Sequence, residues 1–312
     1  MEQKTPAVSV IINCHNSAPF LRETIGSVFA QTFTDWEIVA WDDASEDETP
    51  QIAKSYGEKV RYFRGEKAAS LGQARNYAFK EARGKYVAFL DHDDLWLPRK
   101  LERQVALFEK SPEVGLVYTQ TVFFNNSGDH HLAYREKPPE GLVFRDLIND
   151  YPFVLSSVMI RKEAVRGLQE VFDDRFHFIE EMDLFLRILH DWRAAYLEEP
   201  LTKYRMHEKS FTFSHGLFYP EEKELLVQKL ISLYPHFSEE YTNELLTLES
   251  QIAYEEFLKS WREGDAKRAR RLARQSPAWN KKLKIVYALS RLMPFSFYVA
   301  LRRLIKRRFY SV

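Results

Sequence analysis

The amino-acid sequence predicts an α/β fold with a mostly parallel central sheet, followed by a helical extension. Over the first 110 positions, short apolar and β-branched segments alternate with longer amphipathic segments. This alternation is typical of right-handed βαβ units, whose parallel strands are covered by helices on both faces. Beyond residue 220 the pattern changes to a Leu-rich, helical one, which predicts the extension.

The first cycle starts at residues 7–14 (AVSVIINC), an apolar run that is typical of a buried strand. A helix can follow, because Ser17 is a capping residue type and Pro19 suits a first turn. The later cycles repeat this order, with strands predicted at 36–41, 59–63 and 85–90 and helices predicted after Glu48, at 71–82 and at 97–110.

From about residue 113 to 215 the pattern is irregular. Strand-like pieces (GLVYTQTVFF, VLSSVMI, AAYLEE and LTKYRM) accompany one helical stretch near 180–190. From residue 220 onward the sequence is helical, as in ELLVQKLISL. We therefore expect two domains, an α/β domain over residues 1–219 and a helical extension over 220–312.

The composition indicates an ordinary globular protein, with 45% hydrophobic and 29% charged residues in 312. A single cysteine, Cys14, excludes an internal disulfide framework and fits a reducing compartment. We find no secretory signal in MEQKTPAVS and no apolar run of about 18 residues that could span a membrane. We expect a cytoplasmic protein that is peripheral on the cytoplasmic face of the membrane.

The formal net charge of zero conceals an asymmetry. The chain carries 45 acidic and 45 basic residues, yet residues 266–312 hold fourteen Lys and Arg and no acid, which leaves 45 acids against 31 bases in residues 1–265. An acidic body with a basic tail behaves as two electrostatic objects rather than as one neutral molecule.

Polar clusters follow three of the predicted strands, at Asn13–Asn16, Asp42–Asp47 and Asp91–Asp94. Open α/β sheets bind ligands at the carboxyl ends of their strands, so these clusters mark the expected site. Asp91 and Asp93 could face one hard divalent cation, Mg²⁺ or Mn²⁺, whose shell a substrate phosphate would complete. The alternative is a helix cap, but one Asp would be enough for that role.

Five segments in order resemble a known family. SVIINCHNS, EIVAWDDASEDET, GQARNYAFKEARGKYVAFLDHDD, RFHFIEEMDLFLRI and YRMHEKSFT are similar to the family 2 glycosyltransferases with the GT-A fold. The similarity covers about two thirds of the chain. It implies a GT-A domain that uses a nucleotide sugar. UDP as the nucleotide is an expectation from the family, since no residue of this sequence fixes the base.

The resemblance also implies which residues hold the donor. Asn13, His15 and Asn16 would line the floor of the nucleotide pocket, and Asp43, with Asp42, would receive the base and ribose. By composition alone, the two aspartates fit a polar turn as well as they fit donor binding. The remaining implied donor contacts are Arg75, Asp91, Arg205 and His207, with Asp93 as the more direct metal ligand and Asp91 and His207 as further metal contacts.

Glu180, Glu181 and Asp183 form a second acidic cluster. The family has a Glu-Asp pair here, whose second member is the catalytic base. This sequence has Glu181 where Asp is usual, so Asp183 competes with Glu181 for the role. A positioned carboxylate that takes the proton of an acceptor hydroxyl contributes typically about 10²–10⁴-fold to the rate. The alternative is a solvated first turn, where acidic residues suit the helix dipole.

The last segment, FYVALRRLIKRRFY, predicts a basic amphipathic helix with Phe297 and Tyr298 on its apolar side. Such helices bind anionic lipid surfaces. Nucleic-acid binding and docking onto the acidic body are the alternatives. We favour membrane contact, because many related transferases use lipid-linked acceptors, and we expect no nucleic-acid partner.

The resulting hypothesis is an inverting transfer of a sugar from a nucleoside-diphosphate sugar to an acceptor hydroxyl on a glycan or lipid-linked glycan. A non-catalytic sugar-nucleotide or glycan-binding protein on the same scaffold is the main alternative. A metal-dependent nucleotidyltransferase would want a phosphate loop rich in glycine and lysine, and none is present near the N-terminus. A nicotinamide enzyme is disfavoured because NCHNSA stands where G-x-G-x-x-G would be expected.

Overall fold

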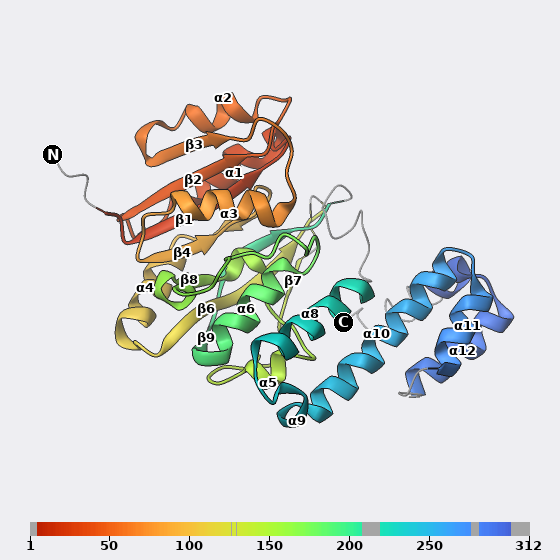
Figure 1. Ribbon diagram of the computed structural model, residues 1–312. Coiled ribbons are helices and arrows are strands. Elements are labelled where there is room, and N and C mark those ends of the chain that lie inside the picture. The colour runs from red at the N-terminus through yellow and green to blue at the C-terminus, as the bar shows by residue number, and fades with distance from the viewer. Residues whose placement is uncertain (1–4, 126, 129, 208–218, 276–280, 301–312) are drawn as a thin grey trace. The chain divides into compact units, whose positions relative to one another are not determined.

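The computed structural model describes residues 5–125, 127–128, 130–207, 219–275 and 281–300 (Figure 1). The chain divides into two compact units, Met1–Ser214 and His215–Val312. The first unit holds a mixed β-sheet with helices on both faces, and the second is helical. The α/β fold with a helical extension is therefore confirmed.

The first part of the sheet is parallel, as predicted. β1 (Val8–Cys14) lies between β2 (Trp36–Asp42) and β4 (Tyr86–Phe89), and β3 (Val60–Arg64) pairs with β2. The crossover helices are α1 (Ala18–Phe29), α2 (Thr49–Lys54) and α3 (Leu71–Glu81). The strand order β3-β2-β1-β4 brings the ends of β2, β1 and β4 together at one edge.

Beyond β4 the sheet is mixed, because β8 (Met159–Arg161) runs antiparallel to both β4 and β6 (Val114–Phe124). β9 (Arg193–Arg205) runs parallel to β6. The other strands and short helices of this region are β5 (Leu95–Trp96), β7 (His130–Leu132), α5 (Phe144–Leu147) and the 3₁₀ turns Gly57–Lys59, Leu155–Ser157 and Lys162–Val165. The two strands that the sequence suggested at AAYLEE and LTKYRM are one strand, β9, whose register with β6 shifts around Pro200.

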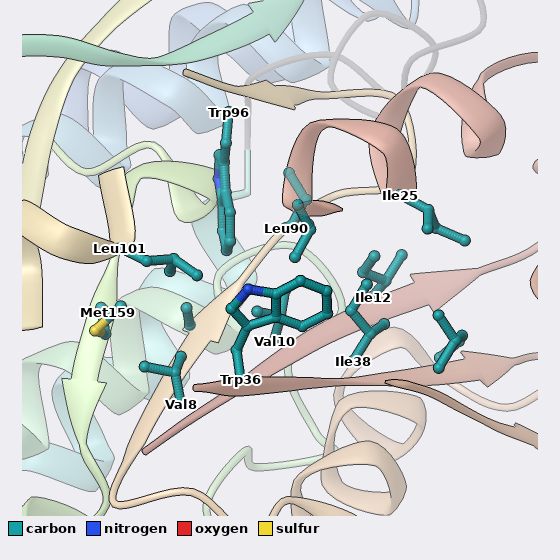
Figure 2. Close-up of a cluster of buried hydrophobic side chains, with 14 of the residues drawn as sticks. Val8, Val10, Ile12, Ile25, Trp36, Ile38, Leu90, Trp96, Leu101 and Met159 are labelled. Carbon is teal, nitrogen blue, oxygen red and sulfur yellow. The ribbon is translucent and has the colours of Figure 1, made fainter. Parts of the chain in front are cut away.

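Side chains of β1 alternate between two cores, as period-two strands do. On one face, Val8, Val10 and Ile12 pack with α1, α2 and α4 (Lys100–Lys110), and Figure 2 shows this cluster around Trp36. Cys14 belongs to it, and burial raises the pKa of its thiol. On the other face, the Phe89 ring meets Phe185 of α6 (Glu180–Asp191) at 6.3 Å.

The first described helix of the second unit, α8, begins at Pro220. Its helices are α8 (Pro220–Leu233), α9 (Phe237–Glu240), α10 (Thr242–Arg262), α11 (Ala266–Gln275) and α12 (Lys281–Leu292), followed by helical residues at 295–300. Helices within the described residues include none with the length and apolar character to cross a bilayer.

One expectation for the tail has to be corrected. Phe297 is exposed, but Tyr298 packs in the core of the second unit, its ring 5.1 Å from that of Trp261. The two residues therefore do not share an outward apolar side. The rest of the predicted amphipathic helix, 301–312, lies outside the described residues.

Candidate functional site

The candidate site lies at the carboxyl ends of β1, β2 and β4, which are neighbours in the sheet. His15 and Asn16 follow β1, Asp43 follows β2, and the Asp91–Asp94 loop follows β4. Arg75 comes from α3, and Glu180 and Glu181 come from the first turn of α6. The topology thus brings residues that are distant in sequence to one edge.

The loops after β1 and β2 are tied to each other. His15 Nδ1 lies 2.7 Å from the carbonyl oxygen of Asp43, and the Asn16 side chain accepts a hydrogen bond from the amide of Glu46 at 2.9 Å. Asn16 and Ala44 have φ values of 50° and 56°, in the left-handed region that L-residues rarely adopt. Such strain persists where surrounding contacts hold it, commonly at ligand sites.

Asp42 and Asp43 have different environments. Asp42 is fully buried, where it accepts hydrogen bonds from the Tyr62 hydroxyl at 2.5 Å and the Ser45 amide at 2.9 Å. Asp43 is partly exposed and accepts from the Ala69 amide at 3.0 Å. Burial raises the pKa of Asp43, although the Ala69 amide opposes this shift. Of this pair, Asp43 is the carboxylate that a ligand can reach.

Asn13, at the end of β1, has a side-chain Nδ2 atom that is buried without a hydrogen-bond partner. Buried polar groups in folded proteins are almost always hydrogen-bonded, so an unpaired one calls for a partner. The predicted pocket floor therefore carries an unused donor.

The loop after β4 meets the end of β9. His207 Nε2 lies 2.8 Å from Oδ2 of Asp93, and the Arg205 guanidinium donates to the Asp93 carbonyl oxygen at 2.8 Å. Arg205 is buried between the rings of Phe20 and Phe124 and pairs with Glu23 at 2.6 Å. Asp93, from one predicted motif, and Arg205 and His207, from another, therefore form one group.

Asp94 holds this loop in place. It is fully buried, and its carboxylate accepts from the Ser156 hydroxyl at 2.5 Å and the Arg205 amide at 2.9 Å. Ser156 also accepts from the Asp91 amide at 3.1 Å. Burial, with Asp91 and Asp93 adding, raises the pKa of Asp94 well above its usual range. The role of Ser156 is not evident from the sequence, where its only signal is a serine pair within an apolar segment.

Three of these side chains have the chemistry that a divalent cation binds, although their ligand atoms do not all lie within 4.8 Å of one another. Asp91, Asp93 and His207 offer carboxylate oxygens and an imidazole nitrogen, a donor set that Mn²⁺ and Mg²⁺ accept. Burial raises the pKa of Asp91, with Asp93 adding and Arg75 opposing. A nearby cation would favour the ionised forms of these carboxylates.

Arg75 connects this loop to the second acidic cluster. It is almost fully buried, lies 3.7 Å from Asp91 and 3.2 Å from Glu181, and also pairs with Glu180. The Glu181 side chain keeps 22% of its surface exposed. Burial raises the pKa of Glu181 to about 8, with Arg75 opposing and Glu180 adding. A carboxylate with a raised pKa in an accessible place suits a general base.

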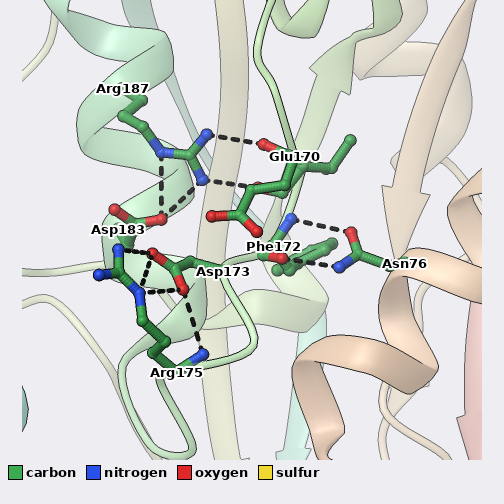
Figure 3. Close-up of polar contacts among 8 residues, drawn as sticks. Asn76, Glu170, Phe172, Asp173, Arg175, Asp183 and Arg187 are labelled. Atoms are coloured by element: carbon green, nitrogen blue, oxygen red, sulfur yellow. Dashed lines mark hydrogen bonds and ion pairs between the residues drawn. The ribbon is translucent and has the colours of Figure 1, made fainter. Parts of the chain in front are cut away.

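Asp183 is placed differently, as Figure 3 shows. It is fully buried and pairs with Arg187 of the next helical turn at 2.6 Å. Arg187 donates in turn to the carbonyl oxygens of Glu170 and Val171. These contacts fix α6 to the preceding loop, which makes Asp183 a structural residue in this arrangement.

A further acidic group lies on the same loop. Oxygen atoms of Glu170, Asp173 and Asp174 fall within 4.8 Å of one another. Among the described residues, this is the acidic group that is spaced closely enough to hold a metal. Asp173, however, pairs closely with Arg175 (Figure 3). Asp174 accepts a hydrogen bond from Gln73 of α3 at 3.0 Å. Because the Arg175 guanidinium already neutralises Asp173, this acidic group anchors the loop.

Comparison with known proteins adds independent information. The family model described as glycosyl transferase family 2 matches residues 9–168. The uncharacterized glycosyltransferase RT0329 of Rickettsia typhi is 31% identical over 224 residues, 68% of this chain and 68% of its own. The UDP-Glc:alpha-D-GlcNAc-diphosphoundecaprenol beta-1,3-glucosyltransferase WfgD of Escherichia coli is 27% identical over 208 residues, 66% of this chain and 79% of its own.

Two solved structures share the fold. S. aureus TarS 1–349, crystallised with UDP-GlcNAc, matches with a TM-score of 0.64 and 20% identity, covering 86% of this chain and 81% of its own. The mannosyltransferase PcManGT of Pyrobaculum calidifontis, in complex with GDP-Man and Mn²⁺, matches with a TM-score of 0.58 and 16% identity, covering 96% of this chain and 87% of its own. The GT-A architecture is therefore confirmed.

Proposed function

The chain belongs to glycosyl transferase family 2, and from that premise we propose that this nucleotide-sugar-dependent transferase moves a sugar onto an acceptor hydroxyl with inversion of the anomeric centre. The observation that carries the proposal is the position of Arg75. It joins Asp91, beside the Asp93–His207 pair, to the accessible carboxylate of Glu181. The guanidinium of Arg75 thus contacts both the proposed diphosphate site and the proposed base.

We assign the donor to the ends of β1, β2 and β4. Asp43, His15 and Asn16 would face the nucleoside, and Asn13 would donate to it through its unused Nδ2. A divalent cation held by Asp91, Asp93 and His207 would stabilise the charge that develops on the departing diphosphate. Arg205 keeps these ligands in place by binding the Asp93 carbonyl oxygen.

Glu181 is our candidate for the base. Its carboxylate would take the proton of the acceptor hydroxyl while the oxygen attacks the anomeric carbon and the bond to the diphosphate breaks. A single in-line displacement of this kind inverts the configuration at the anomeric carbon. Asp183 is excluded from the role in our proposal, because its buried carboxylate pairs with Arg187.

The relatives suggest the substrates. TarS and WfgD are named with UDP-sugars and PcManGT with GDP-Man, so a nucleoside-diphosphate sugar, UDP-linked in our proposal, is the donor. The name of WfgD gives a lipid-diphosphate acceptor, which supports a glycan or lipid-linked glycan as acceptor here. We further propose that residues 1–219 catalyse the transfer and that the basic residues of 220–312 bring the enzyme to an anionic membrane surface.

Donor hydrolysis tests this proposal without knowledge of the acceptor. The protein is incubated with UDP-glucose, UDP-GlcNAc or GDP-mannose and Mn²⁺ or Mg²⁺, and release of the nucleoside diphosphate is followed. We expect slow release from at least one UDP-sugar, suppressed by a chelator. Tight, stoichiometric binding of a nucleotide sugar without any turnover would favour the non-catalytic alternative.

A further inference from the structure

Two buried polar atoms beside the proposed base have no hydrogen-bond partner. They are the hydroxyl oxygen of Tyr151 and Oε2 of Glu180. Glu180 is 2% exposed, and its other carboxylate oxygen pairs with Arg75. A buried polar atom that is left unpaired costs folding free energy, so each of these two atoms calls for a polar partner, which a bound ligand can supply.

The two atoms share one environment. Tyr151, Glu180, Glu181 and Arg75 all interact electrostatically, and burial raises the pKa of the Tyr151 hydroxyl further above its usual range. The hydroxyl is therefore a neutral donor near a carboxylate acceptor. A group that accepts from Tyr151 and donates to Glu180 must itself be a hydroxyl or a similar neutral polar group.

The segment around Tyr151 is held at both flanks. The carbonyl oxygen of Pro152 accepts from the Tyr134 hydroxyl at 2.5 Å, and Phe153 packs against Tyr118 with ring centroids 4.7 Å apart. The Tyr151 ring itself meets Phe153 at 5.4 Å and Phe185 at 6.4 Å. Further along, Ser156 is bonded to Asp94 and Asp91. Tyr151 is thus fixed before any ligand arrives, and a fixed donor loses little freedom on binding.

We propose that Tyr151 and Glu180 form a subsite for a second hydroxyl of the acceptor sugar, next to the hydroxyl that is glycosylated. This inference rests on the proposed function. The acceptor is favoured over the donor sugar because Glu181, the neighbour of Glu180 on α6, has to face the acceptor hydroxyl that it deprotonates. Glu180 and Glu181 also pair with the same Nη1 atom of Arg75. The acceptor sugar therefore needs two hydroxyls, one that reacts and one that positions it.

The test compares Tyr151→Phe with Tyr134→Phe. Both changes remove one phenolic hydroxyl, but only that of Tyr134 has a protein acceptor, the Pro152 carbonyl oxygen. Transfer from the active UDP-sugar is measured to methyl glycosides of glucose, galactose, mannose and N-acetylglucosamine and to their monodeoxy analogues. Donor hydrolysis by water and the melting temperature are measured on the same variants.

For Tyr151→Phe we expect an acceptor KM raised about tenfold, as for the loss of one hydrogen bond, with donor hydrolysis unchanged. The melting temperature should be unchanged or raised, because the removed hydroxyl has no partner in the free protein. For the deoxy analogue that lacks the second hydroxyl, wild type and Tyr151→Phe should behave alike. Tyr134→Phe should lower the melting temperature and leave the acceptor KM within about twofold.

The subsite would be overturned if the acceptor KM of Tyr151→Phe were unchanged, or if its donor KM were raised instead of its acceptor KM. A melting temperature of Tyr151→Phe lowered as much as that of Tyr134→Phe would also overturn it. The proposed function fails separately, namely when the wild-type protein releases no nucleoside diphosphate from any donor.

Discussion

His207 Nε2 lies 2.8 Å from Oδ2 of Asp93, although 114 positions separate the two residues. The contact joins the loop after β4 to the end of β9, and the His207 ring also packs on Phe20 of α1 at 4.9 Å. Three elements therefore fix the geometry of one carboxylate–imidazole pair. In the function proposed above, this pair would hold the divalent cation together with Asp91.

Asp93→Ala should abolish transfer and remove the metal dependence of donor binding, because the cation loses its most direct ligand. Calorimetric titration of UDP with and without Mn²⁺ measures the second effect. Asp174→Ala is the matched control, since Asp174 belongs to the acidic group on the loop before α6. Metal-dependent binding that survives Asp93→Ala and disappears in Asp174→Ala would move the metal site to that loop.

Glu181→Gln should lower kcat by at least about 10²-fold with donor affinity little changed, as expected when a general base is removed. Asp183→Asn should instead destabilise the protein, by about 3–5 kcal/mol, because it leaves Arg187 buried without its ionic partner. Steady-state kinetics at low temperature and thermal melting separate the two effects. An inactive but fully stable Asp183→Asn variant, beside an active Glu181→Gln variant, would exchange the assigned roles.

The rate should depend on pH through Glu181. Burial raises the pKa of this carboxyl group to about 8, and a base acts only in its deprotonated form. The kcat/KM for transfer should therefore rise with pH and level off above about 8, since this quantity reports the free enzyme. A profile that is already flat between pH 5 and 8 would argue against Glu181 as the base.

The basic tail should bind anionic membranes. Each basic residue near such a surface contributes about 1 kcal/mol, and salt screens the attraction. We expect the full chain to sediment with phosphatidylglycerol vesicles and to be released at high salt. Deleting residues 301–312 removes five basic residues and keeps Tyr298, which packs in the core of the second unit, so the deletion should weaken sedimentation without unfolding that unit. Equal binding to neutral phosphatidylcholine vesicles would contradict the electrostatic account.

The first half of the sheet could be predicted because its signals are local. Residues 7–14, 36–41 and 85–90 are apolar runs between helical patterns, and each corresponds to a parallel strand within one or two residues. The polar clusters that follow them were therefore placed at one edge correctly. Beyond residue 113 the pairing is antiparallel, or parallel with register shifts between β6 and β9, and it depends on distant partners that local patterns do not encode. Pro200, which stands between the two predicted pieces AAYLEE and LTKYRM, lies inside the bulged strand β9.

For the candidate site too, the local motifs could be predicted from the sequence and the long-range contacts could not. The groups around Asp93 and Arg75 gather residues from motifs that the sequence displays, but their mutual contacts depend on the fold. The spacing of Asp183 and Arg187, four residues apart on one helix, could have indicated their ion pair. Tyr151 and Ser156 carry no such signal, because a tyrosine or serine in an irregular segment becomes significant only through what lies beside it.

The central claim is an inverting transfer from a nucleoside-diphosphate sugar, and the anomeric configuration of the first product tests it most directly. Proton NMR can follow the wild-type protein with Mn²⁺ and UDP-glucose or UDP-GlcNAc, in which the sugar is α-linked, in the presence of an acceptor glycoside. We expect UDP and a β-linked product to appear together before any mutarotation or secondary reaction. An α-linked product, or a sugar transferred without release of UDP, would contradict the account.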